Sequence, residues 1–134
     1  SQGATEGPIR ALVVDDNSIN LDVARRILLR LGCDVLVASG GRKALGILKA
    51  EPIDCVFLDC EMPDLDGFEV CRKIRAGHCG EDKAALLITA MTAHVLPQSR
   101  HKCSEAGMDY FIAKPITLES MDIFLDIWCE RQMS

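Results

Sequence analysis

Three aspartates and one lysine stand directly after short apolar segments of the chain. Asp15 and Asp16 follow Ala-Leu-Val-Val. Asp59 follows Cys-Val-Phe-Leu, and Lys114 follows Tyr-Phe-Ile-Ala. Carboxylate oxygens are the ligands that Mg2+ prefers, a carboxylate can attack phosphorus as a nucleophile, and an ammonium group can neutralise phosphoryl oxygens. These residue types therefore predict a magnesium-dependent phosphoryl-transfer site in which Asp59 is the acceptor.

The apolar segments before these residues have the pattern of strands that are buried on both faces of a parallel sheet. Five such strands are predicted, at Arg10–Val14, Asp34–Ala38, Cys55–Leu58, Leu86–Met91 and Tyr110–Ile112. Each strand is followed by apolar residues at helical spacing, so the chain alternates between strand and helix. Repeated units of this kind favour a parallel sheet with helices on both faces.

Capping residues and helix breakers predict where the helices begin and end. Asn17 or Ser18 can cap the first helix, and Gly32 ends it. Asp66 can cap the third helix, and Gly77 ends it. The other boundaries are the pair Glu51-Pro52 for the second helix, Pro97 and Gly107 for the fourth, and about Thr117 for the fifth.

Five strands of this length fit the flavodoxin-like order 2-1-3-4-5, an α/β fold with a doubly wound parallel sheet and five helices. In that order the first and third strands are neighbours at the topological switch point, where ligands bind beyond the carboxyl ends of the strands. Asp15, Asp16 and Asp59 should therefore meet in space. Thr89 lies inside the fourth strand and should be packed, whereas Thr92 lies just past its end, so we predict that Thr92 supplies a hydroxyl to the site.

The composition is that of one globular domain, with 134 residues of which 49% are apolar. The net charge of −5 argues against nucleic-acid binding. No apolar run approaches the ~18 residues of a membrane-spanning helix, so we expect no direct membrane contact. No secretory signal is visible. We expect residues 1–8 to be a linker or an expression remnant, residues 9–130 to be the folded domain, and residues 131–134 to be a C-terminal tail.

The seven cysteines do not form a disulfide pattern. Their number is odd and no C-x-x-C pair occurs, whereas the disulfide framework of a secreted chain uses an even number. We therefore expect reduced and mostly buried thiols in a cytoplasmic protein. A zinc site from His78, Cys79, His101 and Cys103 is the alternative, but their spacings match no zinc-finger pattern.

Four segments together closely resemble the receiver domains of two-component response regulators. They are V-V-D-D-N-S-I-N, F-L-D-C-E-M-P-D-L-D-G-F-E, A-M-T-A and A-K-P, which occur in the family's order between roughly Ile9 and Trp128. The segments D-C-E-M-P-D-L-D-G-F-E and A-G-M-D-Y-F-I-A-K-P-I are most similar to receivers carried by hybrid sensor histidine kinases. The resemblance implies the CheY-like form of the fold and a role as a switch or relay in phosphorelay signalling.

The resemblance also implies a role for each site residue. Asp59 would accept a phosphoryl group from a phosphohistidine on a histidine kinase or a histidine phosphotransfer protein. Asp15, Asp16 and Asp59 would hold Mg2+, and the backbone carbonyl of Glu61 would be a further ligand. Lys114, together with the threonine predicted above, would bind the phosphoryl oxygens. The domain would undergo only its own phosphorylation and dephosphorylation and would not be an enzyme for a separate substrate.

Signal transmission is expected to depend on Phe111, which stands at the position of the family's switch aromatic. The ring would turn inward when Thr92 moves toward the phosphate, although Phe111 could also be an ordinary core residue. The peptide bond between Lys114 and Pro115 is commonly cis in the family. The fourth helix, the fifth strand and the fifth helix would form a face through which the domain could associate with a second copy.

Two other function classes fit parts of the sequence. The pair Asp59 and Glu61 faintly resembles the D-x-D motif of haloacid-dehalogenase-like phosphatases, but those place the nucleophile after the first strand and need extra length. A flavin-binding module on a flavodoxin-like fold would need a loop rich in Ser, Thr and Gly after the first strand. That loop instead carries Asp15, Asp16 and Asn17.

Overall fold

The structure, a computed structural model, describes the backbone of residues 7–133 and the side chains of residues 7–131. Residues 1–6 of the predicted linker lie outside this range. One sheet is formed by β1 (Arg10–Val14), β2 (Asp34–Ala38), β3 (Cys55–Asp59), β4 (Leu87–Thr92) and β5 (Tyr110–Ala113). The strands alternate with α2 (Ser18–Arg30), α3 (Gly41–Ala50), α4 (Gly67–Arg75), α5 (Pro97–Ala106) and α6 (Leu118–Met133).

All four strand pairs are parallel and the order is β2-β1-β3-β4-β5, which confirms the predicted topology. Because β1 and β3 are neighbours, with Val14 opposite Leu58, the acidic residues that follow them emerge at the same edge of the sheet. Thr92 at the end of β4 lies opposite Ala113 at the end of β5, so the residues after these strands emerge at that edge as well.

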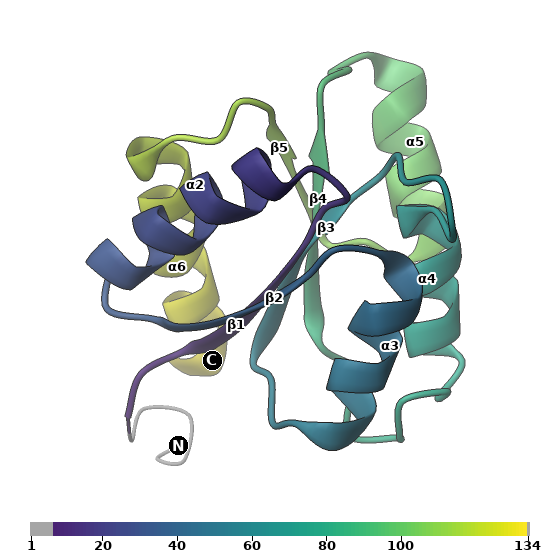
Figure 1. Cartoon of the computed structure of the whole chain (residues 1–134), viewed down its shortest axis with the longest axis horizontal. Coiled ribbons are helices and arrows are strands. Elements are labelled where there is room, and N and C mark those ends of the chain that lie inside the picture. Colours follow the sequence, from purple (N-terminus) through teal and green to yellow (C-terminus); the bar gives the residue numbers. More distant parts are fainter. Residues whose placement is uncertain (1–6, 134) are drawn as a thin grey trace.

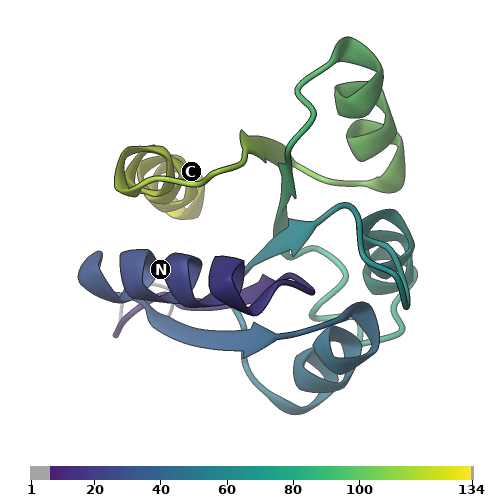
Figure 2. The same ribbon diagram turned by 45° about the horizontal axis from the view of Figure 1, so that its top comes forward.

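The helices cover both faces of the sheet and create two cores. Helices α2 and α6 lie side by side on one face, and α3, α4 and α5 lie on the other (Figures 1 and 2). On the α2 and α6 side, Phe57 packs edge-on against Phe124 with ring centroids 4.7 Å apart. On the other side, Leu48 and Ile74 are among the fully buried residues. The sheet is therefore held between two apolar layers, and the carboxyl ends of its strands are left for polar side chains.

The predicted caps and breakers are confirmed. The Asn17 side chain accepts hydrogen bonds from the first backbone N–H groups of α2, and Asp66 accepts one from Glu69 in α4. Gly32 and Gly107 adopt the left-handed conformation, with φ of 90° and 100°, that ends a helix. Three strands end one residue later than predicted, because Asp59, Thr92 and Ala113 still pair with the neighbouring strand, as their registers show. Strand β4 also begins one residue later than predicted, at Leu87.

The last helix is longer than predicted. Helix α6 runs to Met133, so residues 131–133, which we expected to be a tail, belong to it. Its buried residues include Met121, Leu125 and Trp128, which recur at helical spacing and face the sheet. The apolar face that holds the helix ends at Trp128, while the backbone hydrogen bonds continue for one more turn.

Helix α5 is attached to the sheet by fewer residues than the other helices. Its buried residues are Cys103 and Ala106, and most of its remaining side chains are exposed. The end of α5 is held by Arg75, which donates hydrogen bonds to the carbonyl of Gly107 and to the carboxylate of Asp109. Helix α5 is thus fixed at its carboxyl end, while few apolar contacts fix the rest of it.

Within the described part of the chain, none of the helices is both long enough and apolar enough to cross a membrane.

Candidate functional site

The three predicted carboxylates meet at the carboxyl ends of β1 and β3. Asp15, Asp16 and Asp59 each offer an oxygen within 4.8 Å of the others, and they are the one group of three or more metal-ligating side chains within residues 7–131. Asp15 and Asp59 are only 1% and 2% exposed, whereas Asp16 is open to solvent. The cluster therefore has two buried oxygen donors and one accessible donor, which is the all-oxygen set that Mg2+ binds. The alternative zinc residues form no such group.

Lys114 reaches into this cluster from the end of β5. Its Nζ lies 2.9 Å from Asp59 Oδ1 and 3.2 Å from Asp15 Oδ2, and its side chain is 22% exposed. The peptide bond between Lys114 and Pro115 is cis. Burial alone would lower the pKa of Lys114, but the hydrogen bonds and ion pairs with the two aspartates raise it, so the ammonium group stays charged.

Asp15 is held by its own loop and by α2. Its Oδ1 accepts a hydrogen bond of 2.9 Å from the backbone N–H of Asn17, and its Oδ2 accepts one of 3.3 Å from the side-chain amide of Asn20. Together with the ion pair to Lys114, these contacts occupy both carboxylate oxygens. Asp15 therefore has less free coordination capacity than Asp16. A sequence pattern alone did not identify Asn20 as part of the site.

The two oxygens of Asp59 are not equivalent. Oδ1 accepts hydrogen bonds from Lys114 Nζ and from the backbone N–H of Glu61, at 2.9 and 3.2 Å. Oδ2 has no hydrogen-bond partner among the described residues. Oδ2 is therefore the Asp59 oxygen whose lone pairs remain available to attack an electrophile or bind a cation.

The buried position of Asp59 makes its negative charge costly. Burial raises its pKa to about 6 from 3.8, the Asp15 carboxylate adds to the rise, and the hydrogen bonds from Lys114 and Glu61 oppose it. The folded protein therefore binds the Asp59 proton more tightly than the unfolded chain does. This contribution to stability is complete below about pH 3.8 and is lost as the pH rises through about 6.

We expect Asp59→Asn to be more stable than the parent protein at pH 7 in the absence of divalent cations. The pKa shift corresponds to roughly 2 to 3 kcal/mol, and the difference should shrink toward zero below about pH 4. Urea unfolding between pH 4 and 8 measures it. Asp126→Asn, at an exposed position on α6, is the control and should change stability little at any pH. Equal stability of Asp59→Asn and parent at pH 7 would contradict the argument.

The hydroxyl of Thr92 lies at the end of β4, as predicted, and Thr89 is fully buried. Thr92 Oγ1 accepts a hydrogen bond of 3.0 Å from the backbone N–H of His94, so the hydroxyl is held by the loop that leads to α5. Thr89 Oγ1, in contrast, is buried without a hydrogen-bond partner. Because the Thr92 hydroxyl is hydrogen-bonded only to the loop that leads to α5, it can exchange this hydrogen bond for one with a ligand.

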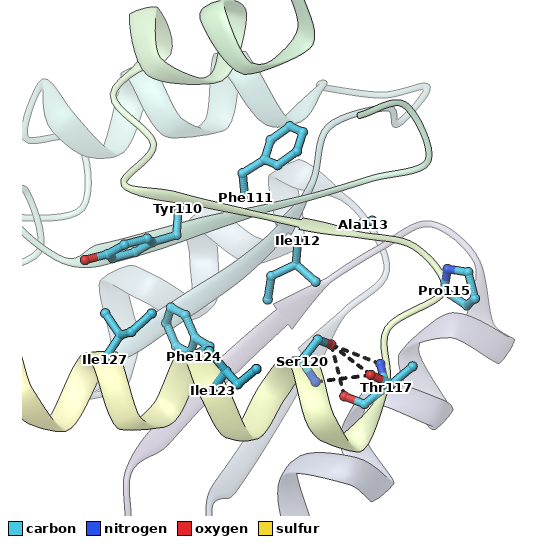
Figure 3. A pocket seen from close by; sticks show the side chains of 10 residues that line it. All are labelled: Tyr110, Phe111, Ile112, Ala113, Pro115, Thr117, Ser120, Ile123, Phe124 and Ile127. Carbon is cyan, nitrogen blue, oxygen red and sulfur yellow. Dashed lines mark hydrogen bonds between the residues drawn. The ribbon is translucent and has the colours of Figure 1, made fainter. Parts of the chain in front are cut away.

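Glu61 lies two residues after Asp59 and contacts it, whereas Phe111 lies inside β5, opposite Ala90 of β4. The backbone N–H of Glu61 donates a hydrogen bond to Asp59, while the exposed Glu61 carboxylate is 3.8 Å from His94 Nε2. The Phe111 ring is half-buried and points toward α5, whereas Ile112 points toward α6 (Figure 3). The Arg100 guanidinium of α5 lies over the Phe111 ring, 5.2 Å from its centroid.

One residue of the site was missed because it has no side chain. A Cβ atom on Gly67 would lie 2.2 Å from the carbonyl oxygen of Asp59. The first turn of α4 can therefore approach the backbone of the acceptor residue only because position 67 is glycine. The glycine in the segment D-L-D-G-F-E is the sequence signal that could have identified it.

The sequence profile of one protein family, described as the response regulator receiver domain, matches residues 11–125. The chain belongs to this family. In this receiver domain the paired acids Asp15 and Asp16, Asp59 and Lys114 lie together at one end of the sheet. It is 42% identical over 110 residues to hybrid signal transduction histidine kinase L of Dictyostelium discoideum, covering 80% of this chain and 6% of the relative.

Solved structures of receiver domains share the fold. The receiver domain of the sensor histidine kinase PA1611 from Pseudomonas aeruginosa, solved with a magnesium ion in the active-site cleft, is 32% identical with a TM-score of 0.82, covering 91% of this chain and 98% of that one. A co-crystal structure of the Saccharomyces cerevisiae histidine phosphotransfer protein Ypd1 with the receiver domain of Ssk1 gives 26% identity and a TM-score of 0.82, covering 91% and 89%.

The family assignment decides between the function classes. This is a receiver domain of two-component phosphorelay signalling, and neither a haloacid-dehalogenase-like phosphatase nor a flavin-binding module is supported. The curated relatives are hybrid histidine kinases and sensor proteins, and the chain spans only 6% and 12% of the length of the first two. The family assignment therefore describes this domain, and the activity of any larger protein is a separate question.

Proposed function

We propose that this receiver domain accepts a phosphoryl group from a phosphohistidine onto Asp59 Oδ2 in the presence of Mg2+. The observation that carries the proposal is the asymmetry of the Asp59 carboxylate. One oxygen is held by Lys114 and Glu61, and the other has no hydrogen-bond partner among the described residues. The acceptor is therefore oriented by one oxygen and reactive at the other.

The step is a nucleophilic displacement at phosphorus. Asp59 Oδ2 forms the new bond to phosphorus, the bond between phosphorus and the histidine nitrogen breaks, and the imidazole leaves with the bonding electron pair. Lys114 releases part of its contact with Asp59 and binds a phosphoryl oxygen, where charge accumulates. Thr92 exchanges its bond to His94 for a second phosphoryl oxygen. The product is an aspartyl-phosphate.

The acidic cluster fits Mg2+ because three carboxylates meet with only one ammonium group to compensate them. We propose that Asp16 and Asp59 bind the ion directly, that Asp15 binds partly through water, and that the carbonyl of Glu61 completes the protein ligands. The ion would neutralise charge on the phosphoryl oxygens during transfer. Without it, the pKa of Asp59 stays raised by burial and the carboxylate is partly protonated near neutral pH.

The partner that supplies the phosphoryl group would dock on an apolar rim beside the crevice. Ile19 is 72% exposed and Val23 42% exposed on α2, and Leu118 is 39% exposed at the start of α6. Val23 and Pro115 line a small cavity of about 100 Å3 with Asp15 and Lys114, so this rim borders the site directly. We propose that a histidine phosphotransfer protein or a histidine kinase covers it, as apolar surface beside a reactive group is typical of a protein-binding site.

Phosphotransfer from a histidine phosphotransfer protein tests the proposal. The Ile19→Asp variant should accept phosphate from the phosphorylated partner far more slowly than the parent does. It should react normally with acetyl phosphate, because the small donor needs no docking. Leu29→Asp is the matched control, since Leu29 is also exposed on α2 but lies at its far end. Equal transfer to all three proteins would reject the rim as the docking site. Failure of the parent with both donors would reject the function.

We expect Thr92 and Phe111 to transmit the signal. Phe111→Ala should accept phosphate at the parent rate, because the ring touches no reacting atom, but α5 and β5 should respond weakly since no ring follows the threonine. Thr92→Ala should also accept phosphate, more slowly because one bond to a phosphoryl oxygen is lost, and should show a weaker conformational response. Amide NMR spectra with and without beryllofluoride, a phosphoryl mimic, measure this. Leu29→Ala, at an exposed position on α2, is the control. An unchanged parent spectrum across residues 94–111 would contradict the switch.

We also propose that the face made by α5, β5 and α6 pairs with a second copy of the domain. It contains an apolar groove of about 440 Å3, in which Phe124 and the exposed Ile123 of α6 face β5 (Figure 3). Helix α5 exposes the basic residues Arg100, His101 and Lys102, and α6 exposes the acidic residues Glu119, Asp122 and Asp126. A two-fold pair would place opposite charges together. Sedimentation velocity with beryllofluoride tests it, and a monomer at all concentrations would reject it.

Three further expectations concern the bounds, the location and the substrates of the domain. We propose that the folded unit comprises residues 9–130 with the last turn of α6, and that it works in the cytoplasm, where free thiols persist. We also propose that it has no separate substrate, because the crevice offers one acceptor carboxylate. Release of inorganic phosphate from added phosphate monoesters at a catalytic rate would contradict this.

A further inference from the structure

Two buried cysteines from different layers of the fold are in contact next to the phosphoryl-transfer site. Cys60 follows the acceptor aspartate at the end of β3, and Cys103 lies in α5. Their Sγ atoms are 3.9 Å apart, and both thiols are free. No other pair of cysteine sulfurs among the described residues makes such a contact, although six of the seven thiols are buried.

A cavity beside the two cysteines has room for a small molecule. Cys60 and Cys103 line one cavity of about 170 Å3, which is bordered by Thr92 and His94 on the side of the site. Water occupies about 30 Å3 in the liquid, so a small hydroperoxide fits this space. The two residues are almost fully buried and belong to the core between the sheet and α3, α4 and α5, and they also line this common cavity.

The two sides of the contact differ in how firmly they are held. The backbone N–H of Cys60 donates to the carbonyl of Met91, and the carbonyl of Cys60 accepts from Gly67, so Cys60 is fixed to β4 and to α4. Cys103 is one of only two buried residues in α5. A disulfide bond is about 2.0 Å long, so the sulfurs must approach by about 2 Å. Cys103 lies in the last turn of α5, near the end that Arg75 holds, so this approach requires rotation of the two side chains with only a small shift of the helix.

We propose that Cys60 and Cys103 form a reversible disulfide bond that fixes α5 against the phosphoacceptor end of β3. A hydroperoxide is the oxidant. The Cys103 thiol gives up its proton, its thiolate attacks a peroxide oxygen, and the O–O bond breaks; the departing hydroxide or alkoxide takes up that proton and leaves as water or an alcohol. The Cys60 sulfur then attacks the sulfenic sulfur of Cys103, the S–O bond breaks, and the proton of Cys60 leaves with hydroxide as water. Two thiols are oxidised and one peroxide is reduced.

Cys103 is assigned the first attack because of its surroundings. Burial raises the pKa of its thiol, while the hydrogen bond with Cys60 and the Lys102 ammonium oppose that rise. The crosslink would hold α5 at one of its two buried positions. That position is near the loop between β4 and α5, to which Thr92 is hydrogen-bonded. The effect on signalling rests on the proposed function, because it matters only if α5 moves on phosphorylation, whereas the bond itself does not depend on that function.

Peptide mapping after hydroperoxide treatment tests the bond. We expect the folded protein to lose two free thiols and to give a tryptic crosslink between residues 50–72 and 103–131 that dithiothreitol removes. Cys129→Ser is a suitable background, since it removes the one exposed cysteine and the second thiol of the latter peptide. In that background Cys60→Ser and Cys103→Ser should both lose the crosslink, and alanine replaces serine if a serine variant does not fold. Cys71→Ser should keep it.

The outcomes separate this inference from the proposed function. Absence of the crosslink in folded protein, or its survival in Cys60→Ser, would overturn the inference. A crosslinked protein whose α5 amide signals respond to beryllofluoride as strongly as those of the reduced protein would overturn the restraint on α5. If the reduced protein itself ignores beryllofluoride, the proposed switch fails, and the peptide map still decides whether the bond forms.

Discussion

Asp59→Asn should abolish phosphorylation completely. Incubation of the parent with acetyl phosphate or phosphoramidate and Mg2+ should add one phosphoryl group to the intact mass, and the variant should gain none. The physical reason is that Asp59 is the one cluster carboxylate that has both a buried, oriented oxygen and an oxygen without a partner among the described residues. An amide in its place is a poor nucleophile, although it fills the same space.

The control for this experiment is Asp64→Asn. Asp64 lies five residues further along the same loop, but its carboxylate is exposed and accepts hydrogen bonds from the backbone of Gly41 and Arg42 at the start of α3. It should phosphorylate at the parent rate. A full phosphate adduct on Asp59→Asn would show that another group accepts the phosphoryl group and would refute the assignment.

Asp16→Ala should weaken Mg2+ binding by about 10- to 100-fold, the loss expected when an interaction with a charged group worth about 1.5 to 3 kcal/mol is removed. Asp15 cannot compensate, because the contacts with Lys114, Asn17 and Asn20 already occupy both of its oxygens. Phosphorylation should fall in parallel. The variant should also be somewhat more stable than the parent without metal, since one of three neighbouring negative charges is gone.

Isothermal titration with Mg2+ measures the affinity, and Asp126→Ala on the exposed surface of α6 is the matched control. The control should bind Mg2+ as the parent does, which shows that loss of one negative charge from the protein is not enough. If Asp16→Ala binds as tightly as the parent, the assignment of the accessible ligand is wrong.

The positions of the site residues could be predicted because they depend on local patterns and one topological rule. Buried strands appear as short apolar runs, and a parallel sheet collects whatever follows them at one edge. Asp15, Asp16, Asp59 and Lys114 therefore meet as expected. The predicted strand ends were wrong by one residue at positions such as Thr92. Thr92 has the polarity of a loop residue and yet pairs with Ala113 on the neighbouring strand.

The remainder depends on contacts between distant segments, for which the sequence has no periodic signal. Nothing in the spacing of the cysteines indicates that Cys60 and Cys103, which are 43 residues apart, place their sulfurs in contact. The difference between the two oxygens of Asp59 also depends on the position of Lys114 Nζ, which bonds to only one of them. The length of α6 beyond Trp128 was missed because apolar spacing predicts the part of a helix that packs and not the part that continues into solvent.

Gly67 limits how the specificity of this module can be redesigned. Helix α4 begins with this glycine against the carbonyl oxygen of Asp59, at a distance that leaves no room for a methyl group. A designer who grafts a partner-binding helix in place of α4 can vary residues from Phe68 onward, but an added carbon atom at position 67 would displace the backbone of Asp59, the proposed acceptor. Such a chimera would keep every acidic residue and still misplace the proposed nucleophile, and a comparison of motif residues between donor and recipient would not reveal the fault.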